Sequence, residues 1–141
     1  MTTLKLEIVS PDRLVLAEEV EELQIPGKAG YIGVLPGHTP LVTELDIGEM
    51  SYKKEGQSQY VSIVFGYCEI SSDRINILAE KAEKAEEIDF SRAAESHHRA
   101  EERLSNLQAT DIDFDRAASS LKRAKTRMEV SKKTGNAHSN E

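Results

Sequence analysis

Hydrophobic and polar residues alternate along the first part of the chain, up to about residue 80. Leu4, Leu6 and Ile8 are separated by single charged residues, and Ile75 and Ile77 repeat the alternation near the end of this part. Because successive side chains of a strand point to opposite faces, the pattern predicts strands with one buried side and one solvent-facing side. Turn-forming groups of Pro, Gly, Ser and Asp interrupt it at intervals of roughly eight to twelve residues, which is typical of antiparallel sandwiches and barrels.

The period of the pattern changes to that of a helix after Ile88. Mostly apolar residues then recur at steps of three and four, first at Phe90, Ala93, His97, Ala100 and Leu104, and later at Phe114, Ala117, Leu121, Ala124 and Met128. No Gly or Pro occurs between Ile88 and Lys133, so this segment can form long helices. Residues 108–111 predict the break between two antiparallel helices.

The two helical segments are near-copies of each other. Residues 88–104 (IDFSRAAESHHRAEERL) align with residues 112–128 (IDFDRAASSLKRAKTRM) at an offset of 24 positions. Two such copies facing each other predict a quasi-symmetric hairpin, because a solenoid needs about three repeats. Residues 134–141 are small and polar, and we expect them to form a disordered tail.

The two periods together predict an α+β fold with two parts. We expect residues 1–85 to form an antiparallel β-sandwich and residues 86–133 an antiparallel two-helix hairpin. The seam of the hairpin is rich in alanine, and a buried methyl group contributes far less than the roughly 1.5–3 kcal/mol of a buried Leu or Ile side chain. The hairpin is therefore expected to be mobile.

The chain has 141 residues and a net charge of −7, which is unevenly distributed. Residues 1–87 hold 16 acidic and 8 basic side chains, whereas residues 88–141 hold 9 acidic and 10 basic ones. This balance argues against nucleic acid as the partner, because phosphate binding requires a basic surface. The second predicted helix, residues 112–133, carries seven basic and three acidic side chains, which suits docking on an acidic protein surface.

Sequence motifs of catalysis, metal binding and membrane insertion are missing. The chain has no P-loop, no dinucleotide-binding glycine pattern and no metal-type cluster of His and Cys. Its one cysteine, Cys68, cannot form an internal disulfide. No apolar run approaches the ~20 residues that cross a bilayer, and the chain opens on a strand-like segment rather than a signal peptide. We expect a soluble protein that is not an enzyme and has no metal site.

Four arginines of the hairpin are candidates for an anion site. Arg92 and Arg99 are seven positions apart on the first helix, and Arg123 and Arg127 are four apart on the second. In a folded hairpin these guanidinium groups could converge on one phosphate-bearing ligand, for which arginine has a suitable geometry. The alternative is that the arginines form a solvated face and that Asp89 only caps the first helix.

The most distinctive loop runs from Gly30 to Leu41. Pro36 and Gly37 suit the central positions of a type II turn, because Pro presets φ and Gly accepts a positive φ. Considered alone, the loop is an ordinary β-turn with an exposed His38 beside it.

Three stretches of the chain resemble the epsilon subunit of bacterial ATP synthases. They are residues 33–41 (GVLPGHTPL), residues 75–79 (INILA) and residues 88–93 (IDFSRA). The resemblance extends over residues 4–133, and the first and third stretches are specific in this order and spacing. The chain departs from the family at Phe65-Gly66-Tyr67, where the family usually has two glycines.

The resemblance implies a fold, partners and a mode of regulation. The fold would be a ten-stranded β-sandwich that clamps the gamma subunit of the central stalk and rests on the membrane-embedded c-ring. The loop of residues 36–40 would lie near these rotor contacts, which makes His38 an interface candidate. The hairpin would permit rotation when folded on the sandwich and block ATP hydrolysis when extended into the alpha/beta catalytic hexamer.

The resemblance also implies a regulatory ATP site, since the folded hairpin binds ATP in some members of the family. The residues of this chain that match the family's nucleotide-binding pattern are Glu83, Asp89, Arg92, Arg99, Arg123 and Arg127. ATP would be a regulatory ligand, and no cofactor would be required.

The leading hypothesis is a non-catalytic central-stalk subunit of a proton- or sodium-translocating ATP synthase. It would be peripheral to the cytoplasmic face of a bacterial plasma membrane and contact that membrane only through the complex. A second hypothesis is a stand-alone nucleotide-sensing protein that uses the hairpin without any rotary complex.

Overall fold

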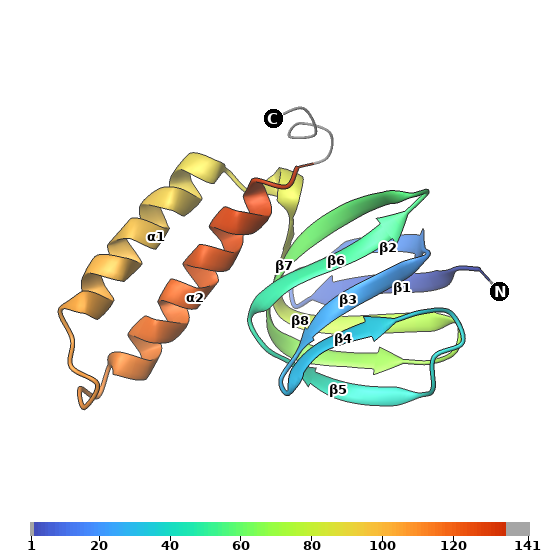
Figure 1. The fold of residues 1–141 in the computed structure, drawn as a ribbon, viewed down its shortest axis with the longest axis horizontal. Coiled ribbons are helices and arrows are strands. Elements are labelled where there is room, and N and C mark those ends of the chain that lie inside the picture. The colour runs from blue at the N-terminus through green and yellow to red at the C-terminus, as the bar shows by residue number, and fades with distance from the viewer. Residues whose placement is uncertain (1, 135–141) are drawn as a thin grey trace.

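Eight strands occupy the first part of the chain and two helices the second in the computed structural model, which describes residues 2–134 (Figure 1). The strands are β1 (Leu4–Ser10), β2 (Arg13–Val20), β3 (Glu22–Gly27), β4 (Gly30–Val34), β5 (Leu41–Leu45), β6 (Gly48–Lys54), β7 (Gln57–Ile70) and β8 (Arg74–Lys84). The helical elements are a 3₁₀ turn, η1 (Ala85–Glu87), and two α-helices, α1 (Phe90–Ser105) and α2 (Phe114–Ser131). The predicted order of a sandwich followed by a helical hairpin is confirmed. Of the predicted tail, residues 135–141 lie outside the described residues.

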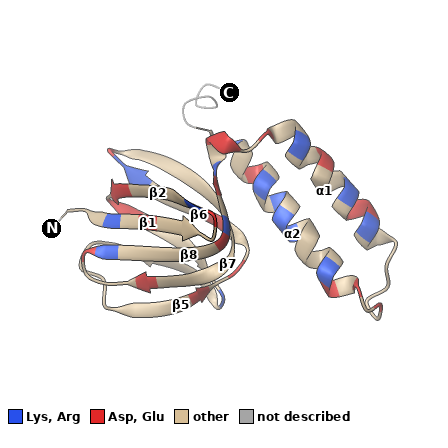
Figure 2. Cartoon of the chain, turned by 180° about the vertical axis from the view of Figure 1, so that it is seen from behind, with Lys and Arg blue, Asp and Glu red and all other residues tan. Residues whose placement is uncertain are grey.

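The strands form two layers. In the rear layer β2, β1, β8, β7 and β5 lie side by side, and β6, β3 and β4 cover them in front (Figures 1 and 2). Within the described residues, all strand pairs are antiparallel except β1 with β8, which run parallel. The parallel pair connects the first strand of the chain with the last strand of the sandwich.

The expected number of ten strands is wrong, because the structure has eight. β7 pairs with β6 through residues 57–63 and with β5 through residues 66–70, so one strand serves both layers. It bends at Phe65-Gly66 but stays paired with β8 on both sides of the bend. Because neither β7 nor β8 is interrupted at the bend, each of them counts as one strand rather than two.

The core lies between the two layers and contains the apolar side of the predicted strands. Leu4, Leu6 and Ile8 are fully buried, as are Ile75 and Ile77, whereas the charged residues between them in β1 face solvent. Each fully buried Leu, Ile or Val side chain stabilises the fold by roughly 1.5–3 kcal/mol. The alternation of apolar and polar residues in the sequence thus reflects which side chains of each strand enter this core.

The repeat forms an antiparallel hairpin whose two ends lie in different environments. Ala93 on α1 and Ala117 and Ala124 on α2 are buried at the seam. Ile88 precedes α1 and is 6% exposed, whereas its repeat equivalent Ile112 precedes α2 and is 97% exposed. The difference arises because only the Ile88 end meets the sandwich, and Ile112 lies at the free end.

A small hydrophobic cluster and ion pairs hold the hairpin on the sandwich. The cluster consists of Ala85, Ile88, Ala93 and Val130, with Tyr60 and Met128 packed against it. Lys122 of α2 and Lys133, just after that helix, reach the sandwich, with Lys122 Nζ 3.3 Å from Asp46 Oδ2 and Lys133 Nζ 2.8 Å from Glu49 Oε1. The predicted division at residues 85–86 falls within η1.

Candidate nucleotide site

The start of α1 positions two of the four candidate arginines. Asp89 is the N-cap residue, and its Oδ1 accepts a hydrogen bond of 3.1 Å from the main-chain N–H of Arg92. This cap satisfies one of the free amides at the helix start and sets the direction of the first turn. Arg92 and Arg99 follow on one side of the helix, and both are exposed. Asp113, the repeat equivalent of Asp89, makes no such cap.

Arg127 on α2 is bound to Glu83 near the end of β8. Its Nε donates to Glu83 Oε1 over 2.7 Å and its Nη2 donates to Oε2 over 3.1 Å. Paired bonds of this kind fix the planar guanidinium against the planar carboxylate. The contact brings together two of the predicted site residues that are 44 positions apart, and it also joins the hairpin to the sandwich.

Arg99 and Arg123 occupy equivalent positions of the repeat and make equivalent bonds. Arg99 Nη2 donates to Ser96 Oγ over 3.2 Å, and Arg123 Nη2 donates to Ser120 Oγ over 3.0 Å. Each arginine is therefore turned back along its own helix in this structure.

A polar cavity of about 360 Å³ lies at the start of α1 and is bordered by α2. It is lined by Glu87, Asp89, Arg92, Glu95, Ser96, Arg99 and Arg127. The structure thus gathers Asp89 and three of the four predicted arginines around one space, and Glu83 holds Arg127 at its edge. Arg123 does not line this cavity. Glu87, Glu95 and Ser96 are lining residues that the sequence did not indicate.

The carboxylate of Glu87 forms hydrogen bonds with groups outside the cavity. It accepts two hydrogen bonds of 2.8 Å from Arg13, at the start of β2, and one of 2.9 Å from the main-chain N–H of Lys84. The hydrogen bond to Arg13 is the main cause that lowers the pKa of Glu87 to about 2. Because Asp89 caps α1 and Glu87 binds Arg13, two of the three lining carboxylates already have partners.

His38 lies far from this cavity. The loop between β4 and β5 is at the end of the sandwich that points away from the hairpin (Figure 1). Gly37 has a φ of +88°, and the main-chain N–H of His38 donates to the carbonyl of Leu35 over 3.2 Å, as in the predicted type II turn. The His38 ring is half-buried, with Nδ1 2.6 Å from the main-chain oxygen of Thr39. The structure therefore separates His38 from the arginines.

Comparison with known families gives two adjoining matches. The family described as ATP synthase, Delta/Epsilon chain, beta-sandwich domain matches residues 3–85, and the one described as ATP synthase, Delta/Epsilon chain, long alpha-helix domain matches residues 86–132. The chain belongs to the delta/epsilon chain family of ATP synthases. The resemblance seen in the sequence is thereby confirmed. Because the delta/epsilon chain is a non-catalytic subunit, the prediction that the chain is not an enzyme also holds.

Curated relatives of the delta/epsilon family align over most of the chain. It is 46% identical over 132 residues to the ATP synthase epsilon chain of Geotalea daltonii, covering 94% of this chain and 96% of the relative. It is 53% identical over 102 residues to the ATP synthase epsilon chain of Koribacter versatilis, covering 72% of each.

Two solved structures share the fold. A chain in the Euglena gracilis mitochondrial ATP synthase (OSCP/F1/c-ring, rotational state 1) matches with a TM-score of 0.77 at 23% identity, over 92% of this chain and 81% of that one. A chain in the Tetrahymena thermophila mitochondrial ATP synthase (central stalk and c-ring) matches with a TM-score of 0.53 at 13% identity, over 92% and 94%. Within residues 2–134, neither helix has the length and apolarity to cross a membrane, and no three metal-binding side chains lie together.

Proposed function

We propose that this member of the delta/epsilon family is the regulatory central-stalk subunit of its ATP synthase. In this role the sandwich binds the gamma subunit and rests on the c-ring, while the hairpin controls ATP hydrolysis by the alpha/beta hexamer. The complex would translocate protons or sodium ions across a bacterial plasma membrane, with this subunit on the cytoplasmic side.

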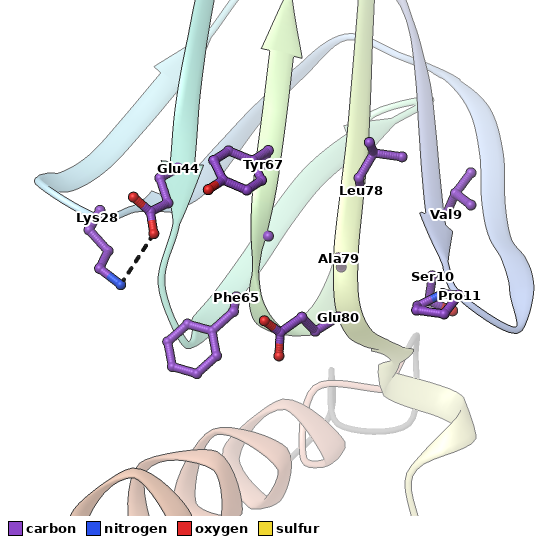
Figure 3. Close-up of a pocket in the computed structure, with 11 residues that line it drawn as sticks. Val9, Ser10, Pro11, Lys28, Glu44, Phe65, Tyr67, Leu78, Ala79 and Glu80 are labelled. Atoms are coloured by element: carbon purple, nitrogen blue, oxygen red, sulfur yellow. Dashed lines mark ion pairs between the residues drawn. The ribbon is translucent and has the colours of Figure 1, made fainter. Parts of the chain in front are cut away.

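The observation that carries the proposal is an apolar row on the outside of the sandwich. Leu14 on β2, Val9 on β1, Leu78 on β8 and Tyr67 on β7 are paired in register across four neighbouring strands. Leu14, Leu78 and Tyr67 are 56%, 61% and 58% exposed. Val9, Leu78 and Tyr67 line an open cleft of about 590 Å³ (Figure 3). Contiguous exposed apolar surface marks a protein-docking site, and we assign this one to the gamma subunit.

A second exposed surface suits the c-ring. Leu35 and Leu41 are exposed at the two ends of the loop that carries His38. This loop is at the end of the sandwich away from the hairpin (Figure 1). The sandwich can therefore contact the c-ring and the hairpin at the same time.

The polar cavity supports regulation by ATP. Arg92 and Arg99 reach it from α1 and Arg127 from α2, so an anion bound there would bridge the two helices. Arg123 would have to leave Ser120 to join them. A ligand that binds only the folded hairpin stabilises that state in proportion to RT ln(1 + [L]/Kd). ATP bound here would therefore favour the folded hairpin and oppose the inhibition of hydrolysis.

Affinity purification of the tagged chain from its native membranes tests the proposal. We expect gamma and the large nucleotide-binding subunits to co-purify, and Leu78→Glu to abolish their recovery because it places a charge within the apolar row. Arg74→Glu, at the start of the same strand and also exposed, is the matched control and should retain the partners. Recovery of the folded wild-type chain alone would contradict the proposal and favour the stand-alone nucleotide sensor.

A further inference from the structure

Phe65 has a backbone conformation that its residue type disfavours. Its φ is +53°, in the left-handed region where a Cβ atom is crowded. Within the described residues, the only other non-glycine residue with positive φ is Glu55, which lies in the tight turn between β6 and β7. Phe65 instead lies inside β7, at the bend where this strand passes from one layer to the other.

The bend itself explains a glycine at the next position but not the phenylalanine. Gly66 has a φ of +140°, and a Cβ atom there would lie 2.1 Å from the carbonyl oxygen of Leu78. No side chain can be accommodated at that position. At residue 65 the left-handed conformation would be easier for glycine, so the fold gains nothing locally from an aromatic residue.

The ring of Phe65 also contributes little to the core. It is half-exposed and does not belong to the hydrophobic cluster between the layers of residues 2–134. The ring contacts Lys28, whose Nζ lies 5.1 Å from the ring centroid. The same Nζ lies 3.6 Å from Glu44 Oε2. Strain that persists without a benefit to packing is characteristic of functional positions.

The ring lies at the end of the apolar row. Phe65 lines the same cleft as Tyr67, Leu78 and Val9, and Figure 3 shows it at the bend of β7, near Lys28 and Glu44 on one side and Glu80 on the other. Only Gly66 separates Phe65 from Tyr67 along the strand, so the phenyl ring lengthens the exposed apolar surface toward the hairpin.

We propose that Phe65 is a partner-binding residue, held in a strained conformation so that its ring extends the apolar row. The occupant is the apolar surface of the gamma subunit, and in this respect the inference rests on the proposed function. Aromatic residues dominate the energetics of such interfaces because they bury a large area at a small cost in side-chain entropy.

Two substitutions at Phe65 distinguish the contribution of the phenyl ring to binding from the cost of the backbone strain. Phe65→Ala removes the ring and keeps a Cβ atom in the left-handed conformation, whereas Phe65→Gly removes both. We expect each variant of the full chain to bind purified gamma subunit at least about tenfold more weakly than wild type in calorimetric titrations. The glycine variant should melt about 4 °C above the alanine variant, because only glycine adopts this φ without crowding. Ile112→Ala, which removes an exposed apolar side chain at the free end of the hairpin, should bind gamma as wild type does.

The outcomes distinguish the inference from the function on which it rests. Wild-type affinity for gamma in both Phe65 variants would overturn the role of the ring and leave the stalk function intact. If the folded wild-type chain does not bind gamma, both the proposed function and this inference are wrong. Equal melting temperatures for the alanine and glycine variants would overturn the assignment of strain to Phe65.

Discussion

Glu83 and Arg127 connect the sandwich with the candidate nucleotide cavity. Two hydrogen bonds, of 2.7 and 3.1 Å, join the carboxylate on β8 to the guanidinium on α2. In the absence of a ligand this carboxylate neutralises Arg127, which would otherwise be a half-buried charge near Arg92 and Arg99. A phosphate-bearing ligand must therefore share Arg127 with Glu83 or displace the Glu83 carboxylate. The Glu83–Arg127 pair thus limits the affinity of the cavity for such a ligand.

The first prediction concerns the arginines of the cavity. Arg92→Ala and Arg127→Ala should each weaken ATP binding by roughly tenfold or more, since a hydrogen bond to a charged group contributes roughly 1.5–3 kcal/mol. Isothermal titration calorimetry of the full chain measures this directly. Lys132→Ala is the control, because Lys132 is exposed at the end of α2 and does not line the cavity. Absence of heat at millimolar ATP with wild type would rule out the site.

The second prediction concerns the division of the chain near Ala85. A chain truncated after this residue should retain the sandwich, because its core cluster consists of residues from β1 to β8. It should bind gamma with unchanged affinity, and the reconstituted complex should hydrolyse ATP at least as fast as with the full chain. A folded truncated chain that no longer binds gamma would refute the division.

The third prediction compares two isoleucines that the repeat makes equivalent. Ile88→Ala should destabilise the docked hairpin by roughly 2–4 kcal/mol, because it leaves a cavity beside Ala85 and Val130. Ile112→Ala should change stability by less than about 0.5 kcal/mol, because the side chain is almost fully exposed. Hydrogen exchange of the helix amides distinguishes the two. Similar losses of protection in both variants would mean that the free end also packs against something in solution.

The fourth prediction is a pH dependence that originates in the contact of Arg13 with Glu87. The contact lowers the pKa of Glu87 from 4.5 to about 2, so its contribution is fully present above about pH 4.5 and is lost as the pH falls toward 2. Arg13→Met should therefore melt below wild type at pH 6, and the difference should vanish near pH 2. We expect at most about 1 kcal/mol, because both side chains are roughly one-third exposed and solvent screens them.

Arg74→Met is the control for this pH dependence, since Arg74 is an exposed arginine on the same sheet. Its melting temperature should follow that of wild type across the range from pH 6 to pH 2. A constant difference between Arg13→Met and wild type at all pH values would show that Arg13 acts through packing rather than through the charge of Glu87.

The sequence by itself determined the elements of the fold and their order. The alternation of Leu4, Leu6 and Ile8 identified a half-buried strand, and the steps of three and four after Ile88 identified the helices. Pro36-Gly37 predicted a turn that the structure contains. These features follow from rules that act over a few residues, such as the period of side-chain direction and the φ angles that Pro and Gly allow.

Only the tertiary structure decided which distant residues meet. The contact of Arg13 with Glu87 spans 74 positions, and no local pattern relates the two residues. The equivalent residues Ile88 and Ile112 are both followed by Asp-Phe, yet one is buried and the other exposed, because only one end of the hairpin touches the sandwich. Pairing between β7 and β8 likewise continues on both sides of the bend at Phe65, so the structure has eight strands where ten were expected. Burial and long-range pairing depend on how whole layers pack, and a periodic sequence is compatible with several such packings until the complete chain has folded.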